Sequence, residues 1–469
     1  MKTDFSKLER AFNPHVVVVV GDSAQSGFQW LTGQKDFNGK LYSVQVNPKS
    51  IQAIEASGVK NYTSLMDIPE PIDLVIVAVP RKFSPQVLED CIRKDVAAAH
   101  FFTAGFSETD TEEGRILERQ LIERAKQASF HLIGPNCMGI FNPKVGIRQN
   151  PYQYRGNVGP VGLISQSGTH CLTFALEAHR EGVDVNKSVS FGNGVVLDST
   201  NYLEYFGQDP EITVIGMYLE GVRDGRRFFE VLREVSARKP VLIWKGGRTE
   251  EGWRAVASHT GSLALPQAVW ESAVRQCGAI NVSGMQELID TMKALIYLPP
   301  VYGRRVAITG GSGGQSVAIA DVFAEAGLSV PLLSQDSYDE LATFFSLIGG
   351  GYRNPIDTGN VNRVEMERIM GILERDTNTD NLVLLVGVGF GMPDNLDGEV
   401  KLMADIRKRT PKPILVVAPF SAPEEMRRVR EVGKKYQPKG IPVFPSIERG
   451  AIALRNAFDY YRKRNGADS

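Results

Sequence analysis

Residues 15–21 read HVVVVVG, a run of five valines that ends at a glycine. A row of β-branched residues favours a β-strand, and a strand without polar positions is typical of a parallel sheet covered on both faces. Further strands are predicted at KLYSVQV (40–46) and IDLVIVAVP (72–80), with helices at 85–96 and 112–128. We therefore predict that the first domain is a parallel α/β domain.

The alternation of strands and helices restarts twice further along the chain. The polar residues 148–160 (RQNPYQYRGNVGP) are interpreted as a linker, and residues 298–305 precede the second restart. Both later parts repeat one outline, a strand, a turn rich in glycine and serine, and a helix, which is typical of flavodoxin-like domains. Their predicted strands lie at 161–168, 188–192, 214–221 and 240–247 in the first part, and at 306–314, 381–389, 413–420 and 441–446 in the second.

Composition limits the classes of function. The chain has 469 residues, which favours about two to four domains, and its 42% hydrophobic and 23% charged residues are typical of a globular protein. A net charge of −1 gives the whole chain no attraction to nucleic acids or anionic membranes, so anion binding must be local. The four cysteines lack CxxC spacing, and we find neither a signal peptide nor an apolar run of bilayer length. We expect a soluble, cytoplasmic protein without a disulfide framework or a zinc site.

The first candidate site is the turn after the valine strand, because ligands of open α/β sheets bind beyond the carboxyl ends of the strands. This turn, GDSAQSG (21–27), lacks GxGxxG spacing, and the next strand ends at Asn47 and Lys49 rather than at an acidic residue. Two interpretations remain open. The turn is either an ordinary tight turn or part of a site for a nucleotide whose ribose carries a phosphate, which a lysine suits better than a carboxylate.

A second turn combines glycine with hydroxyl residues at the start of a predicted helix. In LISQSGTH (163–170), a serine either caps the helix or belongs to a phosphate site made of backbone N–H groups and the helix dipole. The residues concerned are Ser165, Ser167, Gly168 and Thr169.

A third turn, TGGSGGQS (309–316), has the same position between a predicted strand and a helix. It also satisfies the GxSxG pattern of hydrolase nucleophiles, but no histidine follows His259 in the chain to complete a triad. The sequence therefore disfavours a hydrolase.

His259 lies in AVASHTGSLA (255–264), among small and hydroxyl residues. A lone histidine usually packs or is solvated, and no metal-ligand spacing surrounds this one. We predict that residues 245–264 form a long, movable loop, on which an imidazole nucleophile could carry a phosphoryl group. Glu220 follows an apolar strand and is either exposed or turned inward, where it would orient the imidazole.

Taken together, these motifs resemble the α subunit of the ADP-forming (NDP-forming) acyl-CoA synthetases, relatives of succinyl-CoA synthetase. The similar motifs, in family order, are IGPNC (133–137), SQSG (165–168), EGVRDG (220–225), SHTGSLA (258–264) and NPIDTGN (354–360). The resemblance implies an α/β chain with a Rossmann-like CoA-binding domain at 1–146. Two flavodoxin-like parallel-sheet domains would follow, at 155–298, carrying the phosphohistidine loop, and at 303–469.

The resemblance also assigns site residues. His259 would be the phosphorylated histidine and Glu220 its partner, without a protein-bound metal. Phosphate would bind at helix N-termini through Ser167, Gly168, Thr169, Gly313 and Gly314. The CoA site would contain Gly21, Ser23, Asn47, Pro48, Lys49, Val79, Pro80, Ala104, Gly105, Pro135 and Asn136. Residues 190–199 (SFGNGVVLDS) replace a more charged family segment and are expected to line the acyl or phosphohistidine pocket.

The implied enzyme is an acid–thiol ligase. It would reversibly convert acyl-CoA, phosphate and ADP to a small carboxylic acid, CoA and ATP through an acyl phosphate and a phosphohistidine. The three predicted domains leave no segment for an ATP-grasp domain, so we expect ADP or ATP and Mg²⁺ on a separate ATP-grasp β subunit, in an α2β2 assembly. Two alternatives stay open: a CoA-binding regulatory or scaffold protein without catalysis, and an acyl-CoA transferase that works without nucleotide.

Overall fold

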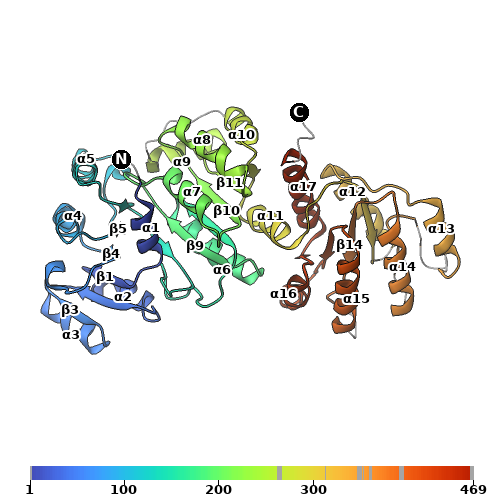
Figure 1. Cartoon of the computed structure of the whole chain (residues 1–469), viewed down its shortest axis with the longest axis horizontal. Coiled ribbons are helices and arrows are strands. Elements are labelled where there is room, and N and C mark those ends of the chain that lie inside the picture. Colours follow the sequence, from blue (N-terminus) through green and yellow to red (C-terminus); the bar gives the residue numbers. More distant parts are fainter. Residues whose placement is uncertain are drawn as a thin grey trace. The chain divides into compact units, whose positions relative to one another are not determined.

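The computed structural model describes residues 3–260, 267–311, 313–345, 351, 353–358, 362–389 and 396–464. The chain forms two compact units. The first consists of Met1–His179 with Asp184–Ser283, and the second of Arg180–Val183 with Gly284–Ser469. Within the described residues, the first unit contains two β-sheets and the second unit contains one (Figure 1).

The first sheet has six parallel strands in the order β3-β2-β1-β4-β5-β6. This is the strand order of the Rossmann fold, in which ligands bind outside the carboxyl ends of the strands. The strands are β1 (Val16–Val20), β2 (Lys40–Val44), β3 (Lys60–Tyr62), β4 (Leu74–Val77), β5 (Ala98–Phe101) and β6 (Leu132–Ile133). The predicted valine strand is therefore a central strand of the sheet.

The valine strand is buried on both faces, as its composition predicts. Val17 and Val19 belong to one core cluster, and Val16, Val18 and Val20 belong to another, because successive side chains of a strand point to opposite faces. The helices of this part of the chain are α1 (Phe5–Phe12), α2 (Gln29–Gly33), α3 (Pro48–Ala56), α4 (Ser84–Arg93) and α5 (Glu112–Gln127), with 3₁₀ turns η1 (Ala24–Ser26), η2 (Leu65–Asp67), η3 (Arg81–Phe83) and η4 (Ser107–Thr109).

The second sheet has the order β12-β11-β10-β8-β9-β7, and β7 runs antiparallel to β9 at its edge. The five parallel strands follow the flavodoxin-like order 2-1-3-4-5, which confirms the predicted fold class. The strands are β7 (Gly139–Phe141), β8 (Val161–Ser165), β9 (Val185–Ser190), β10 (Val214–Leu219), β11 (Val241–Lys245) and β12 (Ile280–Val282). The helices are α6 (Gly168–Arg180), α7 (Ser199–Gln208), α8 (Gly225–Ser236), α9 (Glu250–Thr260) and α10 (Gln267–Gln276).

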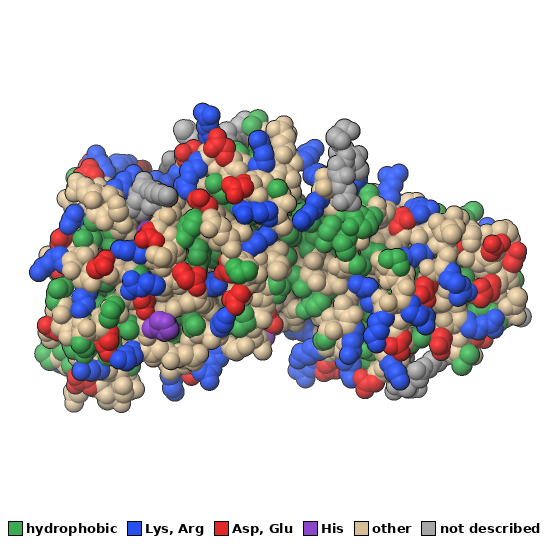
Figure 2. Space-filling view, in the orientation of Figure 1, with side chains coloured by type: hydrophobic (Ala, Val, Ile, Leu, Met, Phe, Trp, Pro, Cys, Tyr) green, Lys and Arg blue, Asp and Glu red, His purple; other side chains and the backbone are tan. Residues whose placement is uncertain are grey.

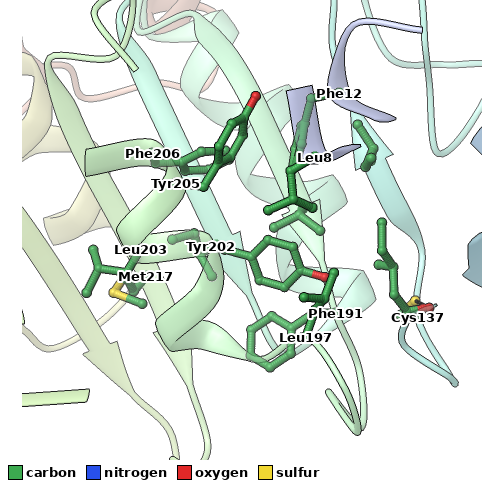
Figure 3. Packing of buried hydrophobic residues seen from close by; sticks show 14 of the residues in the cluster. Leu8, Phe12, Cys137, Phe191, Leu197, Tyr202, Leu203, Tyr205, Phe206 and Met217 are labelled. Atoms are coloured by element: carbon green, nitrogen blue, oxygen red, sulfur yellow. Dashed lines mark hydrogen bonds between the residues drawn. The ribbon is translucent and has the colours of Figure 1, made fainter. Parts of the chain in front are cut away.

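The two sheets of the first unit share a hydrophobic core. Figure 3 shows Leu8 and Phe12 of α1 beside the aromatic side chains of α7. The ring centroid of Phe12 lies 5.2 Å from that of Tyr205 and 5.4 Å from that of Phe206. Removing these large apolar surfaces from water stabilises the contact between α1 and α7, so the two sheets form one compact unit.

Residues 148–160 connect β7 to β8 within the second sheet and pack into this unit. The side chain of Arg148 is buried, with its Nη2 atom 2.7 Å from the carboxylate of Asp36 and its Nε donating to the carbonyl of Gly33. The buried side chain of Gln149 donates to the carbonyl of Gly139 at 2.6 Å. The polar residues of the predicted linker therefore bind buried backbone carbonyls of the unit and the partly exposed carboxylate of Asp36.

The sheet of the second unit has the parallel order β13-β14-β15-β16 within the described residues. Its strands are β13 (Val306–Thr309), β14 (Asn381–Leu385), β15 (Ile414–Val417) and β16 (Val443–Phe444). Its helices are α11 (Met285–Tyr297), α12 (Gly313–Glu325), α13 (Gln335–Ala342), α14 (Arg363–Arg375), α15 (Leu396–Arg409), α16 (Glu425–Tyr436) and α17 (Ile447–Arg464), with a 3₁₀ turn η5 (Gln437–Lys439).

Helix α11 groups with this third sheet, although the sequence assigns it to the domain at 155–298. The guanidinium of Arg449 on α17 binds the carboxylate of Asp290 on α11 at 2.6 and 2.8 Å. Lys293, which is 1% exposed, places its Nζ 2.8 Å from the carboxylate of Glu181. The first pair holds α11 to α17 and the second holds α11 to the segment Arg180–Val183 of the same unit, because breaking such a pair leaves an uncompensated charge.

The surface carries both signs of charge. Basic and acidic side chains alternate across the visible face of each unit (Figure 2), as the net charge of −1 suggests. The four cysteines are buried free thiols. Among the helices that the structure describes, none combines the length and the apolar content that a bilayer span requires.

Candidate active site

A cleft of about 690 Å³ opens at the carboxyl ends of β1, β2, β4 and β5. This is the position at which a Rossmann-type sheet binds its ligand, and the volume suits a small-molecule site. Six of the residues that the sequence assigns to CoA line the cleft: Gly21, Ser23, Asn47, Val79, Pro80 and Ala104. The other five, Pro48, Lys49, Gly105, Pro135 and Asn136, are outside its lining.

Asp22 shapes the first turn of this cleft. The side chain is fully buried and accepts hydrogen bonds from the backbone N–H groups of Trp30 and Leu31, each at 2.9 Å, and from the hydroxyl of Ser26 at 2.7 Å. One carboxylate therefore closes the turn and satisfies N–H groups at the start of α2. The GDSAQSG motif contains Asp22 but does not predict this role, because its N–H partners lie 8 and 9 residues further along the chain.

Asn47 begins helix α3 at the other side of the cleft. Its side-chain oxygen accepts hydrogen bonds from the N–H of Lys49 at 3.0 Å and of Ser50 at 3.4 Å, and Pro48 occupies the first helical position. An Asn cap followed by proline is a strong helix start. The side chain of Gln45 fixes the approach to this cap, because it accepts from the N–H of Asn47 and donates to the carbonyl of Asp22.

Arg81 lines the cleft, although the sequence motifs do not predict it as a site residue. Its Nη1 donates to the carbonyl of Gly105 at 2.7 Å, and its Nη2 lies 2.5 Å from the carboxylate of Glu113. A Cβ atom on Gly105 would lie only 2.8 Å from Cδ of Arg81, and Gly105 has a φ of +105°. Gly105 thus lets the guanidinium lie directly over the loop that follows β5.

Pro135 and Asn136 lie where the two sheets of the first unit meet. The N–H of Asn136 donates to the carbonyl of Thr103 at 3.0 Å, and Thr103 lines the cleft. A Cβ atom on Gly192, in the loop after β9, would lie 2.2 Å from the carbonyl oxygen of Asn136 and 2.4 Å from that of Pro135. The IGPNC motif therefore joins the rim of the cleft to the second sheet.

At the carboxyl end of β8, the SQSG motif turns into helix α6. The hydroxyl of Ser165 donates to the carbonyl of Ser167 at 2.7 Å, and the hydroxyl of Ser167 accepts from the N–H of His170 at 3.3 Å. Ser167 thus caps α6, as one of the two interpretations expects. The first backbone N–H groups of a helix have no acceptor within it, so Gly168 and Thr169 also present the anion-binding end of the helix.

Gln166 connects this turn to the EGVRDG motif. Its side-chain oxygen accepts hydrogen bonds from the N–H of Glu220 at 2.9 Å and from the N–H of Gly221 at 3.2 Å, and its own N–H donates to the carbonyl of Tyr218. Two motifs that are 54 residues apart in sequence are therefore held against each other. The SQSG motif does not predict this role of Gln166, because its partners lie 54 and 55 residues away.

Tyr218 and Lys245 fix the position of Glu220. The hydroxyl of Tyr218 donates to Oε1 of Glu220 at 3.2 Å, and Nζ of Lys245 donates to the backbone carbonyl of Glu220 at 2.7 Å. Burial raises the pKa of Tyr218, with a further contribution from the nearby Glu220 carboxylate, so the hydroxyl remains a donor. Burial lowers the pKa of Lys245.

An aromatic cluster packs beside the SQSG turn. The ring centroid of His170 lies 4.4 Å from that of Tyr218 and 4.6 Å from that of Trp244. Burial lowers the pKa of His170, which favours the neutral imidazole. The sequence alone provides no signal for this cluster, because its three members lie on α6, β10 and β11.

His259 lies near the end of helix α9, so the prediction of a loop over residues 245–264 is wrong for Glu250–Thr260. Thr249 accepts a hydrogen bond from the N–H of Gly252 at 3.1 Å, and Arg254 pairs with Glu250 one turn away at 2.9 Å. The Thr249 cap, the acidic residues of the first turn and the Glu250–Arg254 pair favour a helix, although Gly252 lies within it. The side chain of His259 and residues 261–264 lie outside the described part of the structure, so its pairing with Glu220 stays a prediction.

The third predicted turn opens helix α12 in the second unit. Gly313 and Gly314 are its first residues, whereas Ser312 lies outside the described residues. That Gly313 and Gly314 bind phosphate together with Ser167 stays a prediction. In the NPIDTGN motif, the Asn354 side chain accepts from the N–H of Ile308 at 2.9 Å and donates to the carbonyl of Val306, which ties the motif to β13.

Comparison with known families supports both parts of the first unit. Residues 15–143 match the CoA binding domain, and residues 158–295 match the succinyl-CoA ligase like flavodoxin domain. These ranges contain the cleft and the SQSG and EGVRDG motifs.

Two curated relatives and one solved structure extend the match. The chain is 33% identical over 455 residues to the alpha subunit of ADP-forming acetate–CoA ligase II of Pyrococcus furiosus, covering 95% of this chain and 96% of the relative. It is 37% identical over 383 residues to ADP-forming acetate–CoA ligase I of Archaeoglobus fulgidus, covering 81% of this chain and 55% of the relative. The dinucleotide-forming acetyl-coenzyme A synthetase 1 of Ca. Korarchaeum cryptofilum, solved with phosphate and ADP, is similar with a TM-score of 0.84 at 29% identity. That match covers 98% of this chain and 97% of the solved chain.

The chain thus spans about half the length of the Archaeoglobus ligase but nearly all of the Pyrococcus alpha subunit. The fold, the family matches and the relatives agree with the resemblance drawn from the motifs. The chain belongs to the ADP-forming acyl-CoA ligases and is similar to their alpha subunits almost from end to end.

Proposed function

We propose that this chain is the CoA- and phosphate-handling subunit of an ADP-forming acyl-CoA ligase that works through a phosphohistidine. The observation that supports this proposal most directly is that the cleft and the Glu220 site lie in the same compact unit. A cleft of Rossmann type lies at Gly21 and Asn47, and the capped N-terminus of α6 lies beside Glu220, which Gln166 and Tyr218 hold in place.

The proposed chemistry has three steps, all reversible. A phosphate oxygen attacks the thioester carbonyl of acyl-CoA, the C–S bond breaks, and CoA leaves as the thiolate. An imidazole nitrogen of His259 then attacks the phosphorus of the acyl phosphate, and the carboxylate leaves. The phosphohistidine finally transfers its phosphoryl group to the terminal phosphate of ADP, which yields ATP and restores the imidazole.

Each group of residues has a proposed task. The backbone of Ser167, Gly168 and Thr169 would hold phosphate at the positive end of α6. Glu220 would accept the N–H of one ring nitrogen of His259, which orients the other nitrogen and offsets the positive charge of the phosphorylated ring. Gly313 and Gly314 would supply a second helix N-terminus for the phosphoryl group.

The remaining parts of the reaction are proposed to lie on a partner. A separate ATP-grasp β subunit would bind ADP or ATP and Mg²⁺, most simply in an α2β2 assembly. The substrate would be a small carboxylic acid, since the relatives compared above are acetate–CoA ligases. Neither CoA binding without turnover nor acyl transfer without nucleotide requires an anion-binding helix N-terminus held beside Glu220.

Phosphate labelling tests the proposal. The chain is incubated with ³²P-phosphate and a panel of acyl-CoAs, and the labelled peptide is identified by mass spectrometry under conditions that preserve phosphohistidine. We expect label on the peptide that contains His259, dependent on one class of acyl-CoA, and no label in His259→Asn. His15→Asn, at an exposed histidine, is the matched control and should label normally.

Two results would contradict the proposal. Full labelling of His259→Asn would exclude the phosphohistidine at this position. An absence of label with every acyl-CoA, even after the partner subunit is added, would favour a protein that binds CoA without catalysis.

A further inference from the structure

Asn193 lies between the two sheets of the first unit, in the loop after β9. The sequence predicts that residues 190–199 line the acyl or phosphohistidine pocket, but the amide of Asn193 points to the CoA-binding domain instead. Its Nδ2 donates to Oε2 of Glu108 at 2.7 Å and to Oε2 of Glu118 at 3.0 Å. Its side-chain oxygen faces Nδ2 of Asn136 at 3.4 Å.

The backbone of Asn193 is fixed from both sides, so its side chain is a rigid arm. Its N–H donates to the carbonyl of Pro135 at 3.0 Å, and its carbonyl accepts from Nη2 of Arg223 at 2.8 Å. Arg223 belongs to the EGVRDG motif that also carries Glu220. Asn193 therefore contacts two of the family motifs and two carboxylates of the first domain at once.

The two carboxylates in turn hold the loop at the rim of the cleft. Oε1 of Glu108 accepts from the N–H of Gly105 at 2.6 Å, directly after Ala104, which lines the cleft. Oε2 of Glu118, which is 8% exposed, accepts from the hydroxyl of Ser107 at 2.6 Å. Two carboxylates this close repel each other, and the shared amide donor offsets that repulsion.

The rim segment held in this way has two other neighbours. Arg81, paired with Glu113, donates to the carbonyl of Gly105 from the cleft side. Helix α9, which carries His259, lies against η4, the turn that contains Glu108. A shift of this rim segment would therefore move both the lining of the cleft and the contact with helix α9, which carries His259.

The geometry points to Asn193 as a positioning residue for the CoA cleft, supplied by the neighbouring flavodoxin-like domain. This inference rests on the proposed function, because it concerns CoA as the ligand of the cleft. Asn193 acts through Glu108 and Glu118 and does not itself line the cleft. It makes the affinity for CoA depend on a residue outside the CoA-binding domain.

Exchange of donor and acceptor provides the test. Asn193→Asp places a third carboxylate against Glu108 and Glu118, and we expect the Kd for CoA to rise about tenfold in calorimetry at pH 8, since hydrogen bonds to charged groups are lost. The double variant Asn193→Asp with Glu108→Gln restores one amide donor between two carboxylates, and its Kd should return to within about threefold of wild type. The N–H of Gly105 keeps an acceptor in this variant, because the introduced amide retains a carbonyl oxygen.

A pH series and a kinetic measurement separate positioning from general damage. The defect of Asn193→Asp should shrink towards pH 6, because the introduced carboxyl group can donate to its neighbours once it is protonated, while Arg223 and Arg81 keep their charge. In labelling of His259, the variant should raise the KM for acyl-CoA and leave that for phosphate unchanged. Asn281→Asp is the matched control, since the Asn281 amide donates to the carbonyl of Glu271, at 3.4 Å, in the same unit.

The outcomes distinguish this inference from the proposed function. If wild type does not bind CoA, the proposed function fails. If wild type binds CoA and Asn193→Asp binds it equally well, or if the double variant binds as weakly as the single one, Asn193 has no positioning role. Should Asn193→Asp fail to fold, the double variant carries the test: recovery of folding and CoA affinity supports the inference, and failure of both overturns it.

Discussion

Gly21 offers a direct test of the cleft, because a methyl group added there has no room. Gly21 has a φ of +86°, and its Cβ would lie 2.4 Å from Cγ1 of Val79 and 3.2 Å from the carbonyl oxygen of Ala78. Rotation of the Val79 side chain relieves only the first contact, since the second is to backbone. The substitution Gly21→Ala must therefore displace the strand end that lines the cleft.

The expected magnitude has two parts. A left-handed φ costs an alanine about 1–2 kcal/mol, and overpacking against a fixed neighbour costs about 1–3 kcal/mol more. Gly58 isolates the first part, because it has the same φ of +86° and no atom within 4 Å of a built Cβ. We expect Gly58→Ala to lose about 1–2 kcal/mol of unfolding free energy and Gly21→Ala about 2–5 kcal/mol.

Urea denaturation measures the stabilities, and calorimetric titration measures the affinity for CoA. Because Val79 lines the cleft, Gly21→Ala should raise the Kd for CoA by about tenfold or more, whereas Gly58→Ala should leave it unchanged. Equal stability losses in the two variants, together with wild-type CoA affinity in Gly21→Ala, would refute the assignment of this turn to the CoA site.

Two further predictions concern protonation and the setting of Glu220. Burial lowers the pKa of His100 to about 4, below an unfolded value near 6.5, so the unfolded chain binds a proton that the native chain excludes. This group should lower the stability by about 3 kcal/mol as the pH drops from 6.5 to 4, and His131, whose pKa burial also lowers to about 4, adds its own contribution. His100→Gln should remove the His100 share of this dependence in urea melts at pH 7 and 4.5 and leave that of His131, and an unaltered slope would disprove the assignment. Tyr218→Phe removes the hydroxyl that donates to Glu220 and should slow labelling of His259 about tenfold at unchanged CoA affinity. Tyr152→Phe, at an exposed tyrosine, is the control, and equal rates in both variants would exclude a role for the Tyr218 hydroxyl.

Local patterns were sufficient for the fold class. The valines of HVVVVVG can be buried only in a strand covered on both faces, and Val17 and Val18 indeed enter different cores. Asn47 followed by Pro48 starts a helix by interactions that span only a few residues. The motifs also indicated the family. SQSG and EGVRDG are short enough to be recognised from local sequence, and they follow each other along the chain in the order that the family has.

Local composition was misleading in two places. Glycine and small residues suggested a loop over residues 245–264, but Thr249 and Glu250 start helix α9 there. Polar residues 148–160 suggested a linker, yet Arg148 is buried against Asp36, a residue 112 positions away. For α9, a local cap and ion pair outweigh the glycine-rich composition. For Arg148, the identity of a distant partner, which composition does not contain, determines the structure.

The sequence by itself determined that this chain has a parallel strand ending at Gly21, a serine–glycine turn before α6, and a carboxylate after β10. Only the tertiary structure decided which of these groups meet. Gln166 reaches the Glu220 segment, and Asn193 reaches Glu108 and Glu118, across 54, 85 and 75 residues. The physical reason is that a hydrogen bond acts over about 3 Å in space, and strand order, which no local pattern encodes, sets which residues come within that distance.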